Sequence, residues 1–124
     1  MDTRSKILTP EAAERLSGPI TLVTGYFEVL LAGHARDLQA ARDRAPDRPM
    51  LVVVIGHPGE LMEAGARAEL VAALRVVDYV VAADHDQLDA FIERLRPAEL
   101  VRLETADLAR TRRLIEDAHQ SQKR

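Results

Sequence analysis

The sequence predicts an α/β fold in which a parallel sheet lies between two layers of helices. Short apolar runs alternate with helical patterns along the chain, and this alternation is typical of parallel strands joined by crossover helices. The run 50–55, MLVVVI, is continuously apolar, as in a central strand that is buried on both faces. A length of 124 residues suffices for one hydrophobic core and is short for two. We therefore expect a single domain over residues 1–124 with about five parallel strands.

The first element is delimited by capping and breaking residues. Thr9, Pro10 and Glu11 are typical of a helix start, and the Ser-Gly-Pro sequence at 17–19 ends that helix. Residues 1–19 are thus a lead-in segment with one helix, and residues 104–124 are expected to form a C-terminal helix and tail. The elements predicted between and within these segments are a buried strand over 20–24, a helix over 35–44, the strand over 50–55, a helix over 65–75, a strand over 76–81, a helix over 86–95, a short strand over 98–101 and a polar helix over 105–119.

Composition excludes several classes of function. The net charge is −3, and no basic patch is interleaved with aromatic residues, so we expect no nucleic-acid partner. There is no cysteine, which excludes disulfides and thiolate metal sites, and the four histidines lack metal-ligand spacing. No apolar run approaches the ~20 residues needed to cross a bilayer, and the N-terminus lacks the apolar centre of a signal peptide. We expect a cytoplasmic protein with no membrane partner and no metal held by side chains alone.

Ligands of such sheets bind beyond the carboxyl ends of the strands, where the strand order reverses. The segment 25–34 is of particular interest, because it joins a predicted strand to a predicted helix through a loop that contains Gly25 and Gly33. Backbone N–H groups and the helix dipole favour phosphate at such a helix start, and His34 would add a donor there. The other loops at this edge are expected at 56–65, 82–86 and 102–104.

The residues of this loop resemble a known signature. Gly25-Tyr26-Phe27-Glu28 followed by Leu31-Ala32-Gly33-His34 is similar to the pattern of the cytidylyltransferase-like nucleotidyltransferases, which is G-x-F-D, two residues, then H-x-G-H. The heptose-phosphate adenylyltransferase branch of that family is the most similar. Segments 6–9, 67–81 and 95–101 also resemble it in order, so that the resemblance covers most of residues 6–102. It implies a Rossmann-like three-layer sandwich of the adenine nucleotide alpha hydrolase-like (HxGH nucleotidyltransferase) type.

The resemblance also implies roles for individual residues. His34 would be catalytic, because the family's histidines stabilise charge on the triphosphate as pyrophosphate leaves. Mg²⁺ with ATP or CTP would be the cofactor of an active enzyme, an inactive descendant would have none, and a homodimer is expected. The residues implied to contact the nucleotide are Gly25, Tyr26, Phe27, Glu28, Gly33, His34, Arg67 and Arg102.

Three departures from the family pattern bear on activity. Leu31 occupies the first histidine position of the motif, so that H-x-G-H reads LAGH. The loop after the 50–55 strand lacks the family's lysine, and residues 104–107, ETAD, replace its Ser/Thr-rich third motif. Removing a single donor from a site of developing charge typically costs about 10²–10³ in rate. The sequence therefore predicts a domain derived from an adenylyl or cytidylyl transferase acting on a sugar phosphate, with impaired catalysis; the alternative is a non-catalytic nucleotide-sensing, dimerisation or scaffold domain.

Four further pairs of alternatives stay open at this point. Arg67 can form an ion pair inside the fold or reach a phosphate. His57 can contribute a ligand contact or be a solvent-exposed turn residue, and Glu28 can contact the adjoining loop or be solvated. The Asp84-His85-Asp86 turn can bind a cation or be an isolated polar turn.

Overall fold

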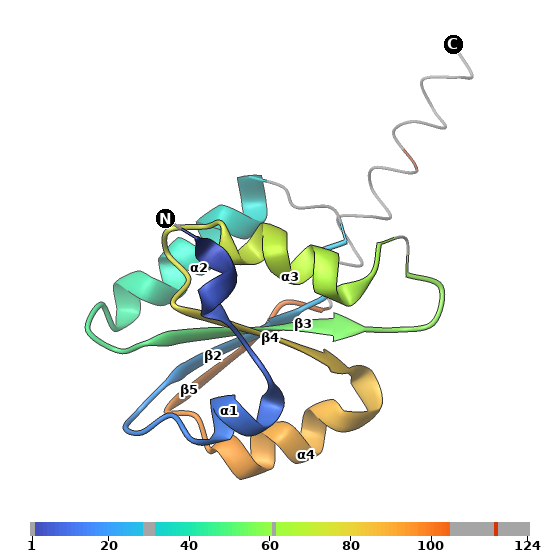
Figure 1. Cartoon of the computed structure of the whole chain (residues 1–124). Coiled ribbons are helices and arrows are strands. Elements are labelled where there is room, and N and C mark those ends of the chain that lie inside the picture. Colours follow the sequence, from blue (N-terminus) through green and yellow to red (C-terminus); the bar gives the residue numbers. More distant parts are fainter. Residues whose placement is uncertain (1, 29–31, 61, 105–115, 117–124) are drawn as a thin grey trace.

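A computed structural model of the chain describes residues 2–28, 32–60, 62–104 and 116. Its centre is a five-stranded sheet in the order β1-β4-β3-β2-β5, in which every neighbouring pair is parallel (Figure 1). The elements are η1 (Thr3–Lys6), β1 (Ile7–Leu8), α1 (Pro10–Glu14), β2 (Thr21–Gly25), α2 (Ala32–Arg44), β3 (Met50–Gly56), α3 (Ala64–Ala72), β4 (Tyr79–Asp84), α4 (His85–Leu95) and β5 (Glu99–Arg102). The predicted α/β class and the parallel sheet are confirmed.

The predicted elements differ from the observed ones mainly at their ends. The strand predicted over 76–81 is β4, which begins at Tyr79, because residues 73–78 form the turn that leaves α3. The fifth strand is β1, which the sequence pattern did not indicate, and it pairs with β4 through Ile7 and Leu8. Most of the helix predicted over 105–119 lies outside the described residues.

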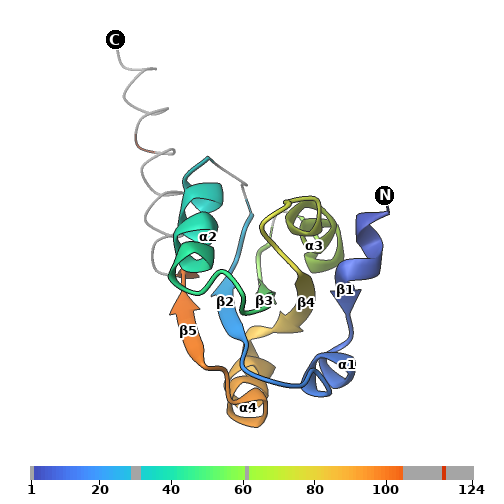
Figure 2. The same ribbon diagram turned by 90° about the vertical axis from the view of Figure 1, so that its left-hand side faces the viewer.

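Helices cover both faces of the sheet. Figure 2 shows α2 and α3 on one face and α1 and α4 on the other. The central strand β3 alternates between the two apolar layers: Val52 and Val54 pack in the layer beneath α2 and α3, whereas Val53 and Ile55 pack in the layer beneath α1 and α4. All seven residues of β3 are buried, which explains why its sequence reads as a continuous apolar run. Among the described residues, no helix is both long and apolar enough to span a bilayer.

The strand order reverses at β2. The chain runs from β2 through α2 to β3 and through α3 to β4, and α4 then returns it across the other face to β5, on the far side of β2. The register aligns Thr24 with both Val53 and Arg102, so the three strands end at one edge of the sheet. This carboxyl edge is where ligands of such sheets bind.

Candidate functional site

The loop after β2 carries the motif residues. Gly25 ends the strand and is buried, and Gly33 lies in the first turn of α2. Phe27 has a φ of 51°, a left-handed backbone conformation that costs a bulky residue roughly 1–2 kcal/mol. Its ring lies 5.3 Å from the ring of His34 between centroids, and both side chains are buried. The turn thus places Phe27 beneath the loop, against the start of α2.

His34 lies where the sequence predicts, in the first turn of the helix that follows the loop. Only 2% of the residue is exposed, however, because it packs against Phe27. In this conformation the imidazole of His34 is buried. Leu31, at the first histidine position of the motif, lies outside the described residues.

The loops after β2 and β3 are joined by Glu28 and His57. The His57 Nε2 atom lies 2.9 Å from Oε1 of Glu28, and the two side chains are only 22% and 16% exposed. The Nε2 atom is buried and, among the described residues, has no partner in hydrogen-bond geometry; its contact with Glu28 is an ion pair only when the imidazole is protonated. The Tyr26 ring meets the imidazole edge-on at 4.6 Å between centroids. Of the alternatives for Glu28, the structure shows the contact with the adjoining loop.

Arg67 holds the same two loops from inside. Its side chain is fully buried although it belongs to α3. The guanidinium donates to the backbone carbonyls of Met62 at 2.9 Å, of Ile55 at 3.0 Å and of Tyr26, and it forms an ion pair with Glu60. All three of its nitrogens are therefore engaged within the protein. Of the two alternatives for Arg67, the structure shows the ion pair inside the fold, and this side chain holds the two loops from the interior.

Arg102 ends β5 at the same edge. Its side chain is 47% exposed and lies 3.4 Å from a carboxylate oxygen of Asp89 and 3.9 Å from one of Glu104. Glu104 accepts a hydrogen bond from the Thr24 hydroxyl, and the Leu103 amide donates to the Thr24 carbonyl at 2.8 Å. The described residues that follow β5, 103 and 104, thus bring a carboxylate next to β2.

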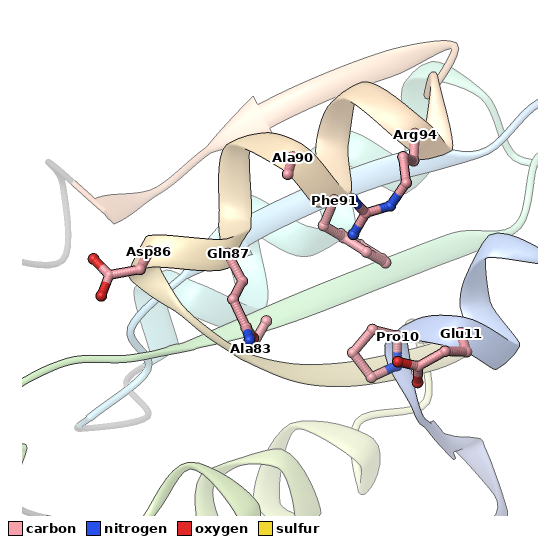
Figure 3. A pocket seen from close by; sticks show the side chains of 8 residues that line it. All are labelled: Pro10, Glu11, Ala83, Asp86, Gln87, Ala90, Phe91 and Arg94. Atoms are coloured by element: carbon pink, nitrogen blue, oxygen red, sulfur yellow. The ribbon is translucent and has the colours of Figure 1, made fainter.

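One cavity lies at the carboxyl edge of the sheet, and another lies on the face that α1 and α4 cover. The first, of about 240 Å³, opens beside the ends of β3 and β4 and contains three carboxylates; its lining residues are Gly56, His57, Pro58, Glu60, Asp84, His85 and Asp86. The second, of about 300 Å³, lies between α1 and α4 (Figure 3). In that view Phe91 and Arg94 of α4 point toward Pro10 and Glu11 of α1, and Arg94 also pairs with Glu14 at 2.6 Å. The motif loop lines neither of these two cavities among its described residues.

Sequence reasoning placed the four loops at one edge but did not foresee which side chains meet there. The contact between Glu28 and His57 depends on the strand register. Because Gly25 pairs with Val54, the residues three positions further along each chain segment, Glu28 and His57, come together. The signal for it was present in the rule that carboxyl ends of parallel strands share an edge. An ion pair of Arg67 inside the fold was one of the two alternatives that the sequence left open, whereas the burial of His34 carried no comparable signal.

Comparison with known proteins agrees with the motifs. The chain is 35% identical over 102 residues to the bifunctional protein HldE of Geobacter sulfurreducens and 34% identical over 116 residues to that of Trichlorobacter lovleyi. These matches include 73% and 82% of this chain, but the chain spans only 20% and 23% of the length of these curated relatives. No protein-family model matches.

The fold has a counterpart among solved structures. The crystal structure of the lipopolysaccharide core biosynthesis protein from Thermoplasma volcanium GSS1 superposes with a TM-score of 0.59 at 22% identity, over 67% of this chain and 73% of that one. Fold and loop signature together define a cytidylyltransferase-like α/β domain. The chain shares the fold and the loop signature of the cytidylyltransferase-like nucleotidyltransferases, and its sequence is similar to part of the bifunctional protein HldE.

Proposed function

We propose that this chain is a nucleotide-binding domain that descends from an adenylyl or cytidylyl transferase of sugar phosphates and whose transferase activity is impaired. The ligand site is the carboxyl edge, at the loop from Gly25 to His34. The observation that carries the proposal is the position of His34. The imidazole that would stabilise the triphosphate lies in the first turn of α2 and is buried against Phe27.

The surroundings of the loop support impaired transfer. The two basic residues expected to contact the nucleotide besides His34 are Arg67, which is engaged entirely within the protein, and Arg102, which lies close to two carboxylates. Preorganised donors aimed at developing charge usually make the largest contribution to this type of catalysis. A site in which these two basic residues are engaged by protein groups stabilises the transition state poorly, although the helix start can still attract a phosphate.

The cofactor of this proposal is Mg²⁺ bound to ATP or CTP. Among the described residues no group of three histidine or carboxylate side chains lies close enough to hold a metal ion by itself. Mg²⁺ in nucleotide sites is commonly held by one or two carboxylates together with substrate phosphates, so the ion would enter with the triphosphate. Glu28 is the carboxylate that the motif loop offers.

Thermal unfolding with added nucleotide tests the binding part of the proposal. A ligand that binds only the folded protein stabilises it by about 2.7 kcal/mol at a hundredfold excess over Kd. We expect ATP or CTP, with Mg²⁺, to raise the Tm of the protein, and the rise to disappear in His34→Ala when each protein is compared with its own ligand-free Tm. His85→Ala, which removes an exposed histidine of the same edge, is the matched control. No shift with either nucleotide at millimolar concentration would overturn the proposal.

Pyrophosphate release in the presence of sugar phosphates tests the catalytic part. We expect little or no turnover by the natural chain, and a gain of about 10²–10³ in rate when Leu31→His restores the H-x-G-H pattern. Turnover by the unchanged chain at the rate of an HldE relative assayed alongside would contradict impaired catalysis.

The homodimer is part of the same proposal and rests on the family resemblance; light scattering of the purified protein tests it.

A further inference from the structure

We infer that His57 is an anion-binding side chain of this site and that Glu28 occupies its position in the absence of ligand. The inference rests on the proposed function, because it names a group that would hold a phosphate at the carboxyl edge. His57 lies outside the motif loop and comes from the neighbouring strand.

The placement of His57 follows from the sheet. Gly25 and Val54 are partners in the parallel pair of β2 and β3. Glu28 and His57 each lie three residues beyond these partners, so the two loops run side by side as they leave the sheet. The Nε2 atom of His57 consequently faces the motif loop, 2.9 Å from the Glu28 carboxylate.

The ring of His57 is oriented by its other contacts. Its Nδ1 atom lies 3.0 Å from the carbonyl oxygen of Pro58, and a carbonyl oxygen can only accept, so Nδ1 carries the proton of that contact. The edge-on Tyr26 ring fixes the imidazole from one side. The buried Nε2 atom is then the ring position left for an external acceptor, and a second proton there makes the ring a cation that faces an acid.

A phosphate oxygen has the chemistry to replace the Glu28 carboxylate at this position. Both groups are anionic acceptors, and a phosphate has more oxygens with which to reach the start of α2 as well. Arg67, a cation near the loop, is engaged with carbonyls and Glu60. Without Mg²⁺, the Glu28 carboxylate therefore competes with a phosphate for His57 and repels it.

Calorimetric titration of the full chain with inorganic pyrophosphate, without Mg²⁺, tests this inference. The variants are Glu28→Gln, which keeps the shape of the side chain and removes its charge, His57→Gln, and the double variant. We expect Glu28→Gln to bind pyrophosphate about three- to tenfold more tightly, a range that corresponds to loss of one partly exposed charge contact. We expect His57→Gln to bind at least about tenfold more weakly, with no gain in the double variant.

Two matched controls separate this effect from a general change of charge. Glu63→Gln removes an exposed acid that makes no side-chain cap at the start of α3, and His85→Gln removes the other histidine of this edge. Both should bind pyrophosphate like the natural chain. Should His57→Gln fail to fold, as judged by circular dichroism, the Glu28→Gln titration decides alone.

The outcomes distinguish the inference from the proposed function. If the natural chain shows nucleotide binding that depends on His34, but His57→Gln binds pyrophosphate unchanged or Glu28→Gln binds it more weakly, the role of His57 is wrong and the nucleotide site stands. If neither triphosphates nor pyrophosphate bind to any variant, both fall. Tighter binding by Glu28→Gln that is abolished by His57→Gln would establish Glu28 as the competing anion.

Discussion

Arg67 is the residue on which the geometry of the carboxyl edge depends most. It is a charged side chain with no exposure, and its bonds reach the loop after β2, the end of β3 and the segment before α3. A buried charge is tolerated only when its donors are matched, and here three carbonyls and Glu60 match them. Its role is to position the loop on which His34 and Glu28 depend, whether or not a nucleotide is bound.

Replacing this side chain by an apolar one of similar length should be severe. Arg67→Met leaves Glu60 and three carbonyls without their donor, and we expect the free energy of unfolding to fall by about 3–5 kcal/mol. Urea denaturation followed by circular dichroism measures the change. Arg75→Met, which alters an exposed arginine just after α3, serves as the control and should change stability by less than about 0.5 kcal/mol. Equal losses in the two variants would show that Arg67 contributes no more than surface charge.

The sequence predicted the positions of individual residues better than their burial and contacts. The motif placed Gly25, Glu28 and His34 on the loop after the first long strand, because spacing along the chain determines it. Whether a side chain is buried depends on packing, so the burial of His34 was not predictable. For Glu28 the sequence left a contact with the adjoining loop open, but only the strand register identifies His57 as its partner. The assigned roles of these residues stay predictions.

At the scale of the element, the predicted types were right for the elements that lie within the described residues, because the patterns are strong. The ends of these elements were displaced because capping depends on geometry. A two-residue strand such as β1 has no periodicity of its own, and only its pairing with β4 makes it a strand. The ends of α1 and α4 illustrate the role of geometry. Arg96, which follows α4, has a φ of 50° in the left-handed region, whereas Arg15, which follows α1, has a φ of −87°.

These two helix ends allow a matched prediction. Arg96→Gly removes the strain of a left-handed side chain and should raise the free energy of unfolding by up to about 1 kcal/mol. Arg15→Gly, at an ordinary helical conformation, should lower it by about 0.5–1 kcal/mol, because glycine adds only chain entropy there. Both arginines are exposed, so lost packing contributes little. Thermal or urea unfolding measures both, and a destabilising Arg96→Gly would contradict the argument.

At the scale of the whole molecule, the sheet divides the core into two apolar layers that share its strands. Leu38 packs in the layer beneath α2 and α3, and Ile55 packs in the layer beneath α1 and α4. The continuous apolar strands made this division predictable, since only a sheet covered on both faces buries them. The order of the strands was not predictable in detail, because the return of the chain to the far side of β2 leaves no local mark in the sequence.

The two layers should unfold together, but the packing of each should contribute independently to the free energy of unfolding. We expect Leu38→Ala to cost about 2–5 kcal/mol and Ile55→Val about 0.5–1.5 kcal/mol. The double variant should lose the sum to within about 0.5 kcal/mol, since the two side chains lie in different layers. A double-mutant cycle by urea denaturation gives the coupling. A coupling well above that value would mean that packing strain passes through the sheet.

The place of β5 in the sheet has a consequence for how the chain acquires its structure during synthesis. Strand β2 needs β5 as a neighbour, but β5 leaves the ribosome only after the other four strands of the described sheet. Until then the nascent chain presents the backbone of β2, a strand whose five residues are all buried in the folded domain, as an open edge that can join another copy. Slower addition of the last residues would prolong that stage, and chaperone occupancy of ribosome-bound chains would be greatest just before Glu99 emerges.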